Sequence, residues 1–257
     1  MTEICKMDIE NSFNKLKESG WLDDNFNTTV LVNFIMELDD NNIRPAKEDI
    51  FNAFKIGKPE DIRVLIIGQD PYPDKEKAHG YAFSVKAPKK RAASLTKIFN
   101  AIDIYCKKTN KSINSNHSYN LEQWANKSKV LLLNSALTYE KSKCFEGKYK
   151  YKKELNEDDL KKLEKAQQEL QKTHMEMWEP FTINIMENLF NKNKNVVVFL
   201  WGDKAKRLFN KCNYKENIKN YASCHPRKRY KGENDKFKKE VSSHFTDSSL
   251  DDVWQDL

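Results

Sequence analysis

The sequence of 257 residues is long enough to bury a substantial hydrophobic core in one domain. Charged residues make up 32% of it and hydrophobic residues 39%, and no run approaches the ~20 consecutive apolar residues of a membrane span. Residues 1–17 mix acidic and basic side chains with single apolar ones, and they lack the apolar block of a secretory signal. We therefore expect an intracellular protein without a membrane partner, in the cytoplasm or nucleoid, or in the nucleus of a eukaryotic or viral host.

The net charge of +7 favours a polyanionic partner, because basic surfaces neutralise phosphates. On its own this surplus does not separate a nucleic-acid-binding protein from one whose many lysines are simply solvated. The five cysteines are widely spaced and form no C-x-x-C pair. We expect them to be reduced thiols, with neither a zinc site nor an iron–sulfur cluster.

Apolar periodicity predicts the secondary structure in chain order. Residues 1–42 have apolar positions at mostly helical spacing, 49–54 is expected to be a short helix, and a further helical pattern begins at Ser94. Continuous apolar runs of strand length, which are typical of buried parallel strands, occur at 64–68, 130–134 and 196–201, with a weaker candidate at 220–223.

This alternation predicts a single α/β domain over 1–257, with a small central parallel sheet flanked by helices and an N-terminal helical part at 1–45. The segment 140–172 differs in composition, because it is rich in Lys and Glu and has a helix start at Asn156. We interpret it as a helical insertion, which is either a solvated surface feature or an arm that contacts DNA or a partner.

Polar residues stand at the carboxyl ends of the expected strands. Ligands of open parallel sheets bind in the crevice outside these ends, so the segments should converge on one rim. The segments are Gln69-Asp70, Asn134, Gly202-Asp203 and His225.

Three of these residues have chemistry that suits a site. Asp70 follows a buried strand and is a candidate base or charge stabiliser, although an Asp before Pro also caps turns. Asn134 can donate and accept hydrogen bonds at a nucleobase edge, and it is equally a common turn residue. His225 precedes a basic segment and could transfer a proton or donate a hydrogen bond near DNA; the alternative is a solvent-exposed histidine.

Together these pieces resemble the classical uracil-DNA glycosylases. The resemblance covers most of residues 46–245, apart from the segment 140–172. The matching segments are Ile50–Phe54, Val64–Tyr72, Lys77–Val85, Ser94-Leu95, Leu121–Asn134, Trp178–Thr182, Val198–Gly202 and His225-Pro226.

The resemblance implies hydrolytic removal of uracil from DNA, without a metal or organic cofactor, by a monomer that acts on single- or double-stranded substrate. It implies that the target base is flipped into a pocket. Asp70 would position water and stabilise the cationic sugar, and His225 would donate to the base oxygen that gains charge. The residues that it implies for base binding are Gln69, Tyr72, Phe83 and Asn134, with Phe83 as the stacking ring and Tyr72 as the wall that rejects thymine.

The resemblance also implies DNA contacts, and here the chain departs from the family pattern. Ser94 matches a phosphate contact. Arg229 stands where the family has a leucine wedge, Pro73 replaces a histidine and Asp203 replaces a phosphate-binding serine; poxvirus members share the first two changes. The basic residues expected to contact DNA are Arg227, Lys228, Arg229 and Lys231.

Two other functions stay open at this point. One is a glycosylase of the same fold that removes another or modified base, for example in defence against foreign DNA. The other is a DNA-binding accessory module with weak catalysis. The sequence leaves a protein inhibitor or other partner unidentified.

Overall fold

The computed structural model of the chain describes residues 5–87, 92–110, 117–143, 156–226, 236–247, 250 and 253. The expected DNA-contact residues 227–231 and most of the first half of the 140–172 segment lie outside this range. In the described part, no helix is long and apolar enough to cross a membrane. Four of the five cysteines lie within it, and none of these four is in a disulfide.

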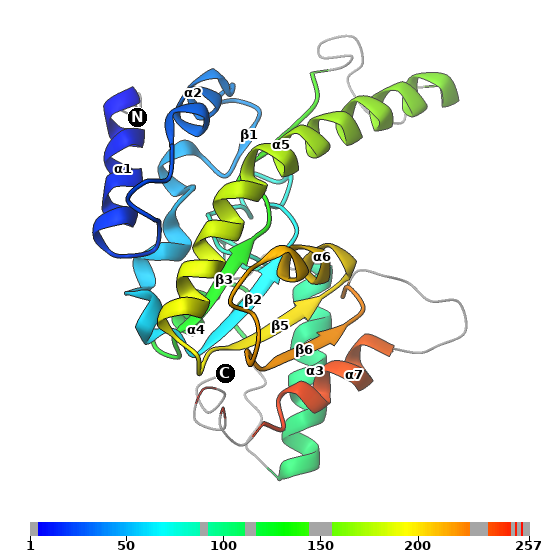
Figure 1. Ribbon diagram of the computed structural model, residues 1–257. Coiled ribbons are helices and arrows are strands. Elements are labelled where there is room, and N and C mark those ends of the chain that lie inside the picture. Colours follow the sequence, from blue (N-terminus) through cyan, green and yellow to red (C-terminus); the bar gives the residue numbers. More distant parts are fainter. Residues whose placement is uncertain are drawn as a thin grey trace.

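A parallel four-stranded sheet forms the centre of the molecule (Figure 1), in the order β3-β2-β5-β6. Its two central strands are completely buried, which explains why they read as continuous apolar runs. The predicted α/β fold and parallel sheet are confirmed. The strands are β2 (Val64–Gly68), β3 (Val130–Asn134), β5 (Val197–Trp201) and β6 (Asn220–Ser223).

Helices cover both faces of this sheet (Figure 1). The long helix α5 and the short helix α6 lie on one face, and α3 packs on the other, with α7 against it. One hydrophobic cluster runs through all of these layers. In chain order, the described α-helices are α1 (Lys6–Glu18), α2 (Thr29–Glu37), α3 (Ala93–Thr109), α4 (Glu122–Asn126), α5 (Glu157–Lys192), α6 (Asp203–Lys211) and α7 (Lys236–His244).

Two segments differ in detail from the sequence-based prediction. The short helix expected at 49–54 consists of two 3-10 helices, Lys47–Asp49 and Asn52–Ile56, on either side of a turn; a third 3-10 helix is Pro59–Asp61. A small antiparallel pair, β1 (Ile43–Arg44) with β4 (Tyr139–Glu140), was not expected, because two-residue strands carry no periodic signal.

The helix expected to begin at Asn156 does begin there, because the Asn156 side chain accepts a hydrogen bond of 2.8 Å from the backbone N–H of Asp159. It continues for 36 residues through Lys192 as α5. The described helical part of the 140–172 segment is therefore the first half of a helix whose second half is buried against the sheet.

A buried polar network anchors α5 to the loop after β3. The indole N–H of Trp178 donates to Thr138 Oγ1 at 2.6 Å, and the Thr138 hydroxyl lies 2.7 Å from Nδ1 of His174. Burial lowers the pKa of His174 to about 4, and this effect outweighs the hydrogen bond with Thr138, which raises it. His174 is thus neutral in the folded protein at neutral pH.

This burial predicts a pH-dependent stability. An unfolded histidine binds a proton below a pKa of about 6.5, whereas folded His174 does so only near 4, so stability falls as the pH drops through this interval. Between about pH 7 and about pH 5, we expect wild type to lose roughly 2 kcal/mol more free energy of unfolding than His174→Gln. Urea unfolding of both proteins at the two pH values measures the difference. Equal losses would contradict a neutral, buried His174.

Candidate active site

The carboxyl ends of the strands enclose a pocket of about 380 Å³. Of the four segments predicted to converge on this rim, Gln69-Asp70, Asn134 and His225 line the pocket, whereas Gly202-Asp203 lines a smaller hollow that also includes His225. Seven of the residues predicted to act in catalysis, base binding or DNA contact line it: Gln69, Asp70, Tyr72, Phe83, Ser94, Asn134 and His225.

The pairing of β2 with β3 positions the amide of the pocket. Their parallel register places Gly68 directly beside Asn134, and both are the last residues of their strands. A Cβ at Gly68 would collide with the side-chain oxygen of Asn134 and would come within 2.8 Å of the Ala82 Cβ. Glycine at this position therefore lets the Asn134 side chain, which is only 6% exposed, lie across the end of β2.

Hydrogen bonds join the loops that follow these two strands. The backbone N–H and the hydroxyl of Ser135 both donate to the Gly68 carbonyl, at 3.0 and 2.9 Å. The N–H of Ala136 donates to the Gln69 carbonyl at 3.0 Å. The Gln69 backbone is thus held in place, and the chain is directed so that Asp70 and Tyr72 reach the pocket.

Phe83 is buried against this rim in an unusual backbone conformation. Its φ is +63°, a region that a bulky side chain rarely adopts, and such residues gather at functional sites. The N–H of Ala82 donates to the Leu132 carbonyl at 2.9 Å, and the Tyr72 hydroxyl donates to the Phe83 carbonyl at 3.0 Å. The Phe83 ring packs edge-on against Trp201, with centroids 5.7 Å apart. Strand β3, Tyr72 and Trp201 together hold it in this position.

A second buried histidine, His79, contacts the segment that contains Phe83 through Ser84. The Ser84 hydroxyl accepts the Leu121 N–H at 2.8 Å and lies 2.8 Å from Nε2 of His79. Burial lowers the pKa of His79, although the carboxylates of Glu122 and Asp49 act in the opposite direction. The backbone around Phe83 is therefore braced by a polar cluster that the sequence analysis did not identify.

His225 reaches the pocket from the end of β6. The N–H of Gly202 donates to the Ser223 carbonyl at 3.1 Å, which brings the ends of β5 and β6 together. Gly202 has a φ of +108°, and a Cβ there would lie 2.9 Å from the Cβ of His225. The imidazole then lies with its centroid 6.3 Å from that of the Phe83 ring. His225 is half-buried and lines the pocket, so the alternative of a solvent-exposed histidine is wrong.

Asp70 is contacted by a helix that the sequence did not connect with it. The Gln171 side-chain amide, on α5, donates a hydrogen bond to Oδ2 of Asp70. Tyr139 is also near: its pKa is raised by burial first and by the negative charge of Asp70 second. An anionic Asp70 thus has an amide donor on one side and a phenol nearby.

Three glutamines of α5 form one wall of this pocket. The Gln167 amide donates to the Glu140 carbonyl at 2.8 Å, and its side-chain oxygen accepts from the Ser142 N–H at 2.9 Å. Gln168 and Gln171 line the pocket beside it. Gln171 lies three residues after Gln168 and four after Gln167, so it is a neighbour of both on the helix surface, a signal visible in the sequence once the helix is known to cross the pocket.

The expected phosphate contact Ser94 lies in the first turn of α3 and is 8% exposed. It lines the pocket, and its contact with DNA remains a prediction. Among the described residues, no cluster of three His, Cys, Asp or Glu side chains could hold a metal ion.

Residues 54–257 match the family model of the uracil DNA glycosylase superfamily. The chain belongs to this superfamily. It is 33% identical over 166 residues to a uracil-DNA glycosylase of Idiomarina loihiensis and 34% identical over 170 residues to one of Francisella tularensis subsp. novicida. Each match covers 64% of this chain and 62% or 61% of the relative, so the chain matches about three fifths of the relatives' length.

Solved structures of the superfamily share the fold. The wild-type UNG structure from Nitratifractor salsuginis superposes with a TM-score of 0.56 at 19% identity, over 93% of this chain and 96% of that one. The mimivirus uracil-DNA glycosylase gives 0.56 at 22% identity, over 84% and 67%. A variant of the mimivirus protein in complex with UGI also gives 0.56, at 21% identity over 85% and 69%.

The glycine at the end of β2 gives a test of the pocket geometry. We expect Gly68→Ala to displace the Asn134 amide and to weaken binding of free uracil, as measured by calorimetry. Once Asn134→Gly has removed that amide, the same Gly68→Ala change should cost less further affinity, because only the contact with the Ala82 Cβ is left. Equal losses in both backgrounds would show that the two positions are uncoupled.

Proposed function

We propose that this protein hydrolyses the N-glycosidic bond of uracil in DNA and leaves an abasic site. The observation that carries this is the convergence, on one strand-end rim, of a stacking ring, an amide, a carboxylate and an imidazole. Membership of the uracil DNA glycosylase superfamily supports the same reaction. The substrate is DNA, single- or double-stranded, the enzyme acts as a monomer, and it works inside the cell where the DNA lies.

The pocket suits a flipped pyrimidine. Phe83 offers an aromatic face on which the base stacks, and Asn134 offers both a donor and an acceptor to the uracil edge. Tyr72 is anchored through its hydroxyl to the Phe83 carbonyl, so its ring holds a constant distance from the stacking platform. That ring is the wall that excludes a methyl group at C5, and therefore thymine.

Bond cleavage places charge on both fragments. As the bond between C1′ and the base nitrogen breaks, its electron pair moves to the base, and the sugar gains positive charge. His225 donates a hydrogen bond to the base oxygen where the negative charge collects. The Asp70 carboxylate stabilises the cationic sugar and orients a water molecule. The water oxygen bonds to C1′, one of its protons leaves to Asp70 and then solvent, and the uracil anion takes up a proton.

The Gln171 amide assists by holding the Asp70 carboxylate in one orientation. A hydrogen bond to the charged form favours an ionised carboxylate, which is the form that the cationic sugar requires.

Replacing the charged groups tests this assignment. We expect Asp70→Asn and His225→Ala each to slow uracil excision by about 10²–10⁴-fold, because positioned electrostatic and proton-transfer groups contribute factors of this size. The rate is measured with a labelled oligonucleotide followed by alkaline cleavage at the abasic site. Asp24→Asn, at an exposed position in the loop after α1, and His117→Ala, beside Asp103, are matched controls that should leave the rate unchanged. Near wild-type excision by both site variants would contradict the mechanism.

The steric role of Tyr72 gives a specificity test. We expect Tyr72→Ala to gain thymine excision, because the space for a C5 methyl group opens. Tyr72→Phe keeps the ring while losing the hydrogen bond to Phe83, and it should stay specific for uracil. Competing uracil and thymine oligonucleotides report the ratio, for which one methyl group is worth about 10–200-fold. If Tyr72→Ala still removes uracil yet ignores thymine, the methyl group is excluded by another residue.

A further inference from the structure

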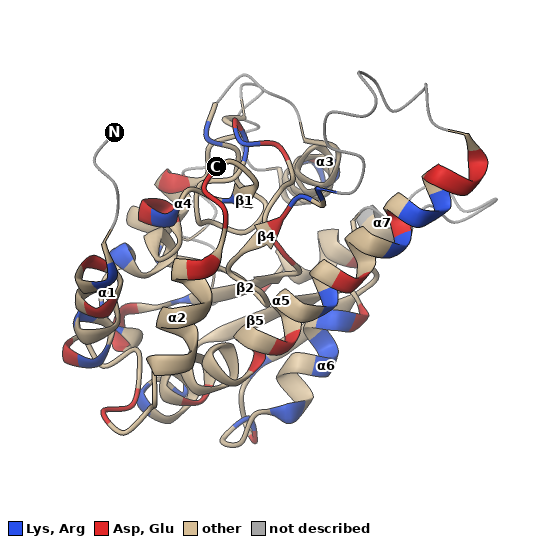
Figure 2. Cartoon of the chain, turned by 90° about the horizontal axis from the view of Figure 1, so that it is seen from above, with Lys and Arg blue, Asp and Glu red and all other residues tan. Residues whose placement is uncertain are grey.

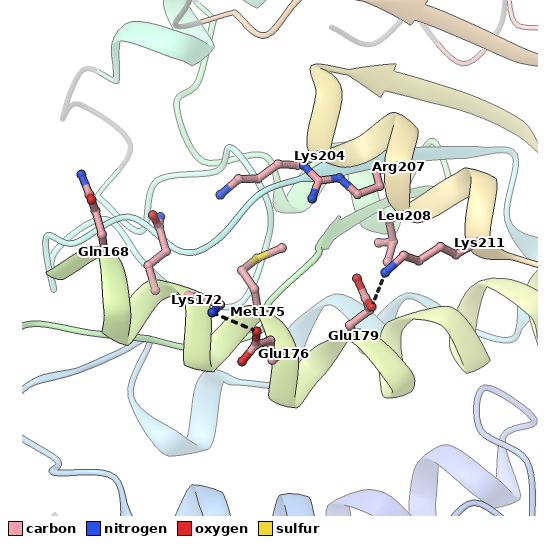
Figure 3. Close-up of a pocket in the computed structure, with 10 residues that line it drawn as sticks. Gln168, Lys172, Met175, Glu176, Glu179, Lys204, Arg207, Leu208 and Lys211 are labelled. Atoms are coloured by element: carbon pink, nitrogen blue, oxygen red, sulfur yellow. Dashed lines mark hydrogen bonds and ion pairs between the residues drawn. The ribbon is translucent and has the colours of Figure 1, made fainter. Parts of the chain in front are cut away.

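A groove of about 480 Å³ runs between α5 and α6, outside the active-site pocket (Figure 3). Helix α5 forms one wall, with Gln168 at one end and Glu179 further along. Helix α6 forms the other wall, from which Lys204 and Arg207 extend into the groove. Lys and Arg gather over α6, whereas the first turn of α5 is acidic (Figure 2).

The charge of this groove is positive. Its described lining includes four cationic side chains and two carboxylates. Both carboxylates are already paired: Glu176 with Lys172 at 3.7 Å, and Glu179 with Lys211 at 2.5 Å. Within the described part of the chain, Lys204 and Arg207 have no carboxylate within ion-pair distance, so these two charges are available to an anion.

The groove is continuous with the active-site pocket. Gln168 and Gln171 line both hollows, and Gln171 is the residue that contacts Asp70. Lys204 also lines a smaller hollow that it shares with Gly202 and His225. A strand whose nucleotide occupies the pocket can therefore continue directly between α5 and α6.

The lining indicates which part of a strand it fits. Met175 and Leu208 supply apolar surface, and no aromatic side chain is among the described residues that line the groove. Sites that hold bases of single strands do so largely by stacking on aromatic rings, whereas backbone tracks rely on cations.

We propose that this groove binds the phosphodiester backbone of the single strand on one side of the flipped nucleotide, through Lys204 and Arg207. The inference rests on the proposed function for the identity of the strand. Asp203, the first residue of α6, would repel a phosphate near the pocket, but its carboxylate lies 3.8 Å from the Lys206 ammonium, which reduces that repulsion. Binding of this kind is insensitive to sequence and strongly sensitive to salt.

The test compares the double variant Lys204→Ala/Arg207→Ala with a control that loses the same charge elsewhere. Lys127→Ala/Lys194→Ala serves this purpose, because these residues precede β3 and β5 and so lie at the opposite end of the sheet. Fluorescence anisotropy measures binding of a uracil-free single strand of roughly 15 nucleotides over a range of NaCl concentrations. The slope of log Kd against log salt should fall in magnitude by about 1.4 for the groove variant, at ~0.7 for each lost phosphate contact, and stay at the wild-type value for the control.

Excision assays locate the contact along the strand. Wild type should remove uracil faster, at limiting substrate, from a strand extended on one side of the uracil than from a trinucleotide. The groove variant should lose that gain and keep the trinucleotide rate.

An unchanged salt slope would overturn the proposal, and so would an equal loss of activity on the trinucleotide, which would place these cations in the catalytic pocket. If wild type excises no uracil at all, the proposed function fails, while the anisotropy comparison still decides whether the groove binds a strand.

Discussion

The pairing of β2 with β3 at their last residues is the constraint on which the site depends. It places Gly68 beside Asn134, and the missing Cβ leaves the space into which the Asn134 side chain folds. The Ser135 and Ala136 hydrogen bonds then continue the attachment to Gln69, one residue beyond β2, and to Ala136, two residues beyond β3. Because Asp70 and Tyr72 follow within a few residues, their positions relative to the amide are set by backbone geometry. A rigid sheet edge of this kind suits a reaction that depends on charge placed in advance of bond cleavage.

Helix α5 is the second element on which the pocket depends. The buried contacts of Trp178 and His174 with Thr138 hold it against the loop that follows β3. Gln171 lies about one turn before His174, so the network that anchors the helix also sets the amide against Asp70. The same helix lines two hollows. Toward the sheet edge its glutamines close the strand-end pocket, and toward α6 it forms one wall of the cationic groove.

Much of the sheet and of the site could be predicted from the sequence. Buried parallel strands read as uninterrupted apolar runs, and the polar residue that ends each run marks the edge where ligands bind. This is why the sequence alone could place Asp70, Asn134 and His225 on one rim. Phe83 and Tyr72 came from the family resemblance, and the structure adds the positive φ and the hydrogen bond that orient them.

The rest could not be predicted, for physical reasons. The Lys- and Glu-rich first half of α5 has the composition of a solvated helix, and only the path of its buried second half shows that Gln171 meets Asp70. The small β1–β4 pair is too short to have a periodicity. The neutral state of His174 follows from burial beside Thr138, a contact between residues 36 positions apart in the chain.

The structure of the Asp70→Asn variant bound to a uracil-containing single strand tests the central claim most directly. The account predicts the uracil ring stacked on Phe83, its edge paired with the Asn134 amide, and His225 within hydrogen-bond distance of a base oxygen. A base that binds outside this pocket, or one that enters it without meeting Phe83 and Asn134, would contradict the account.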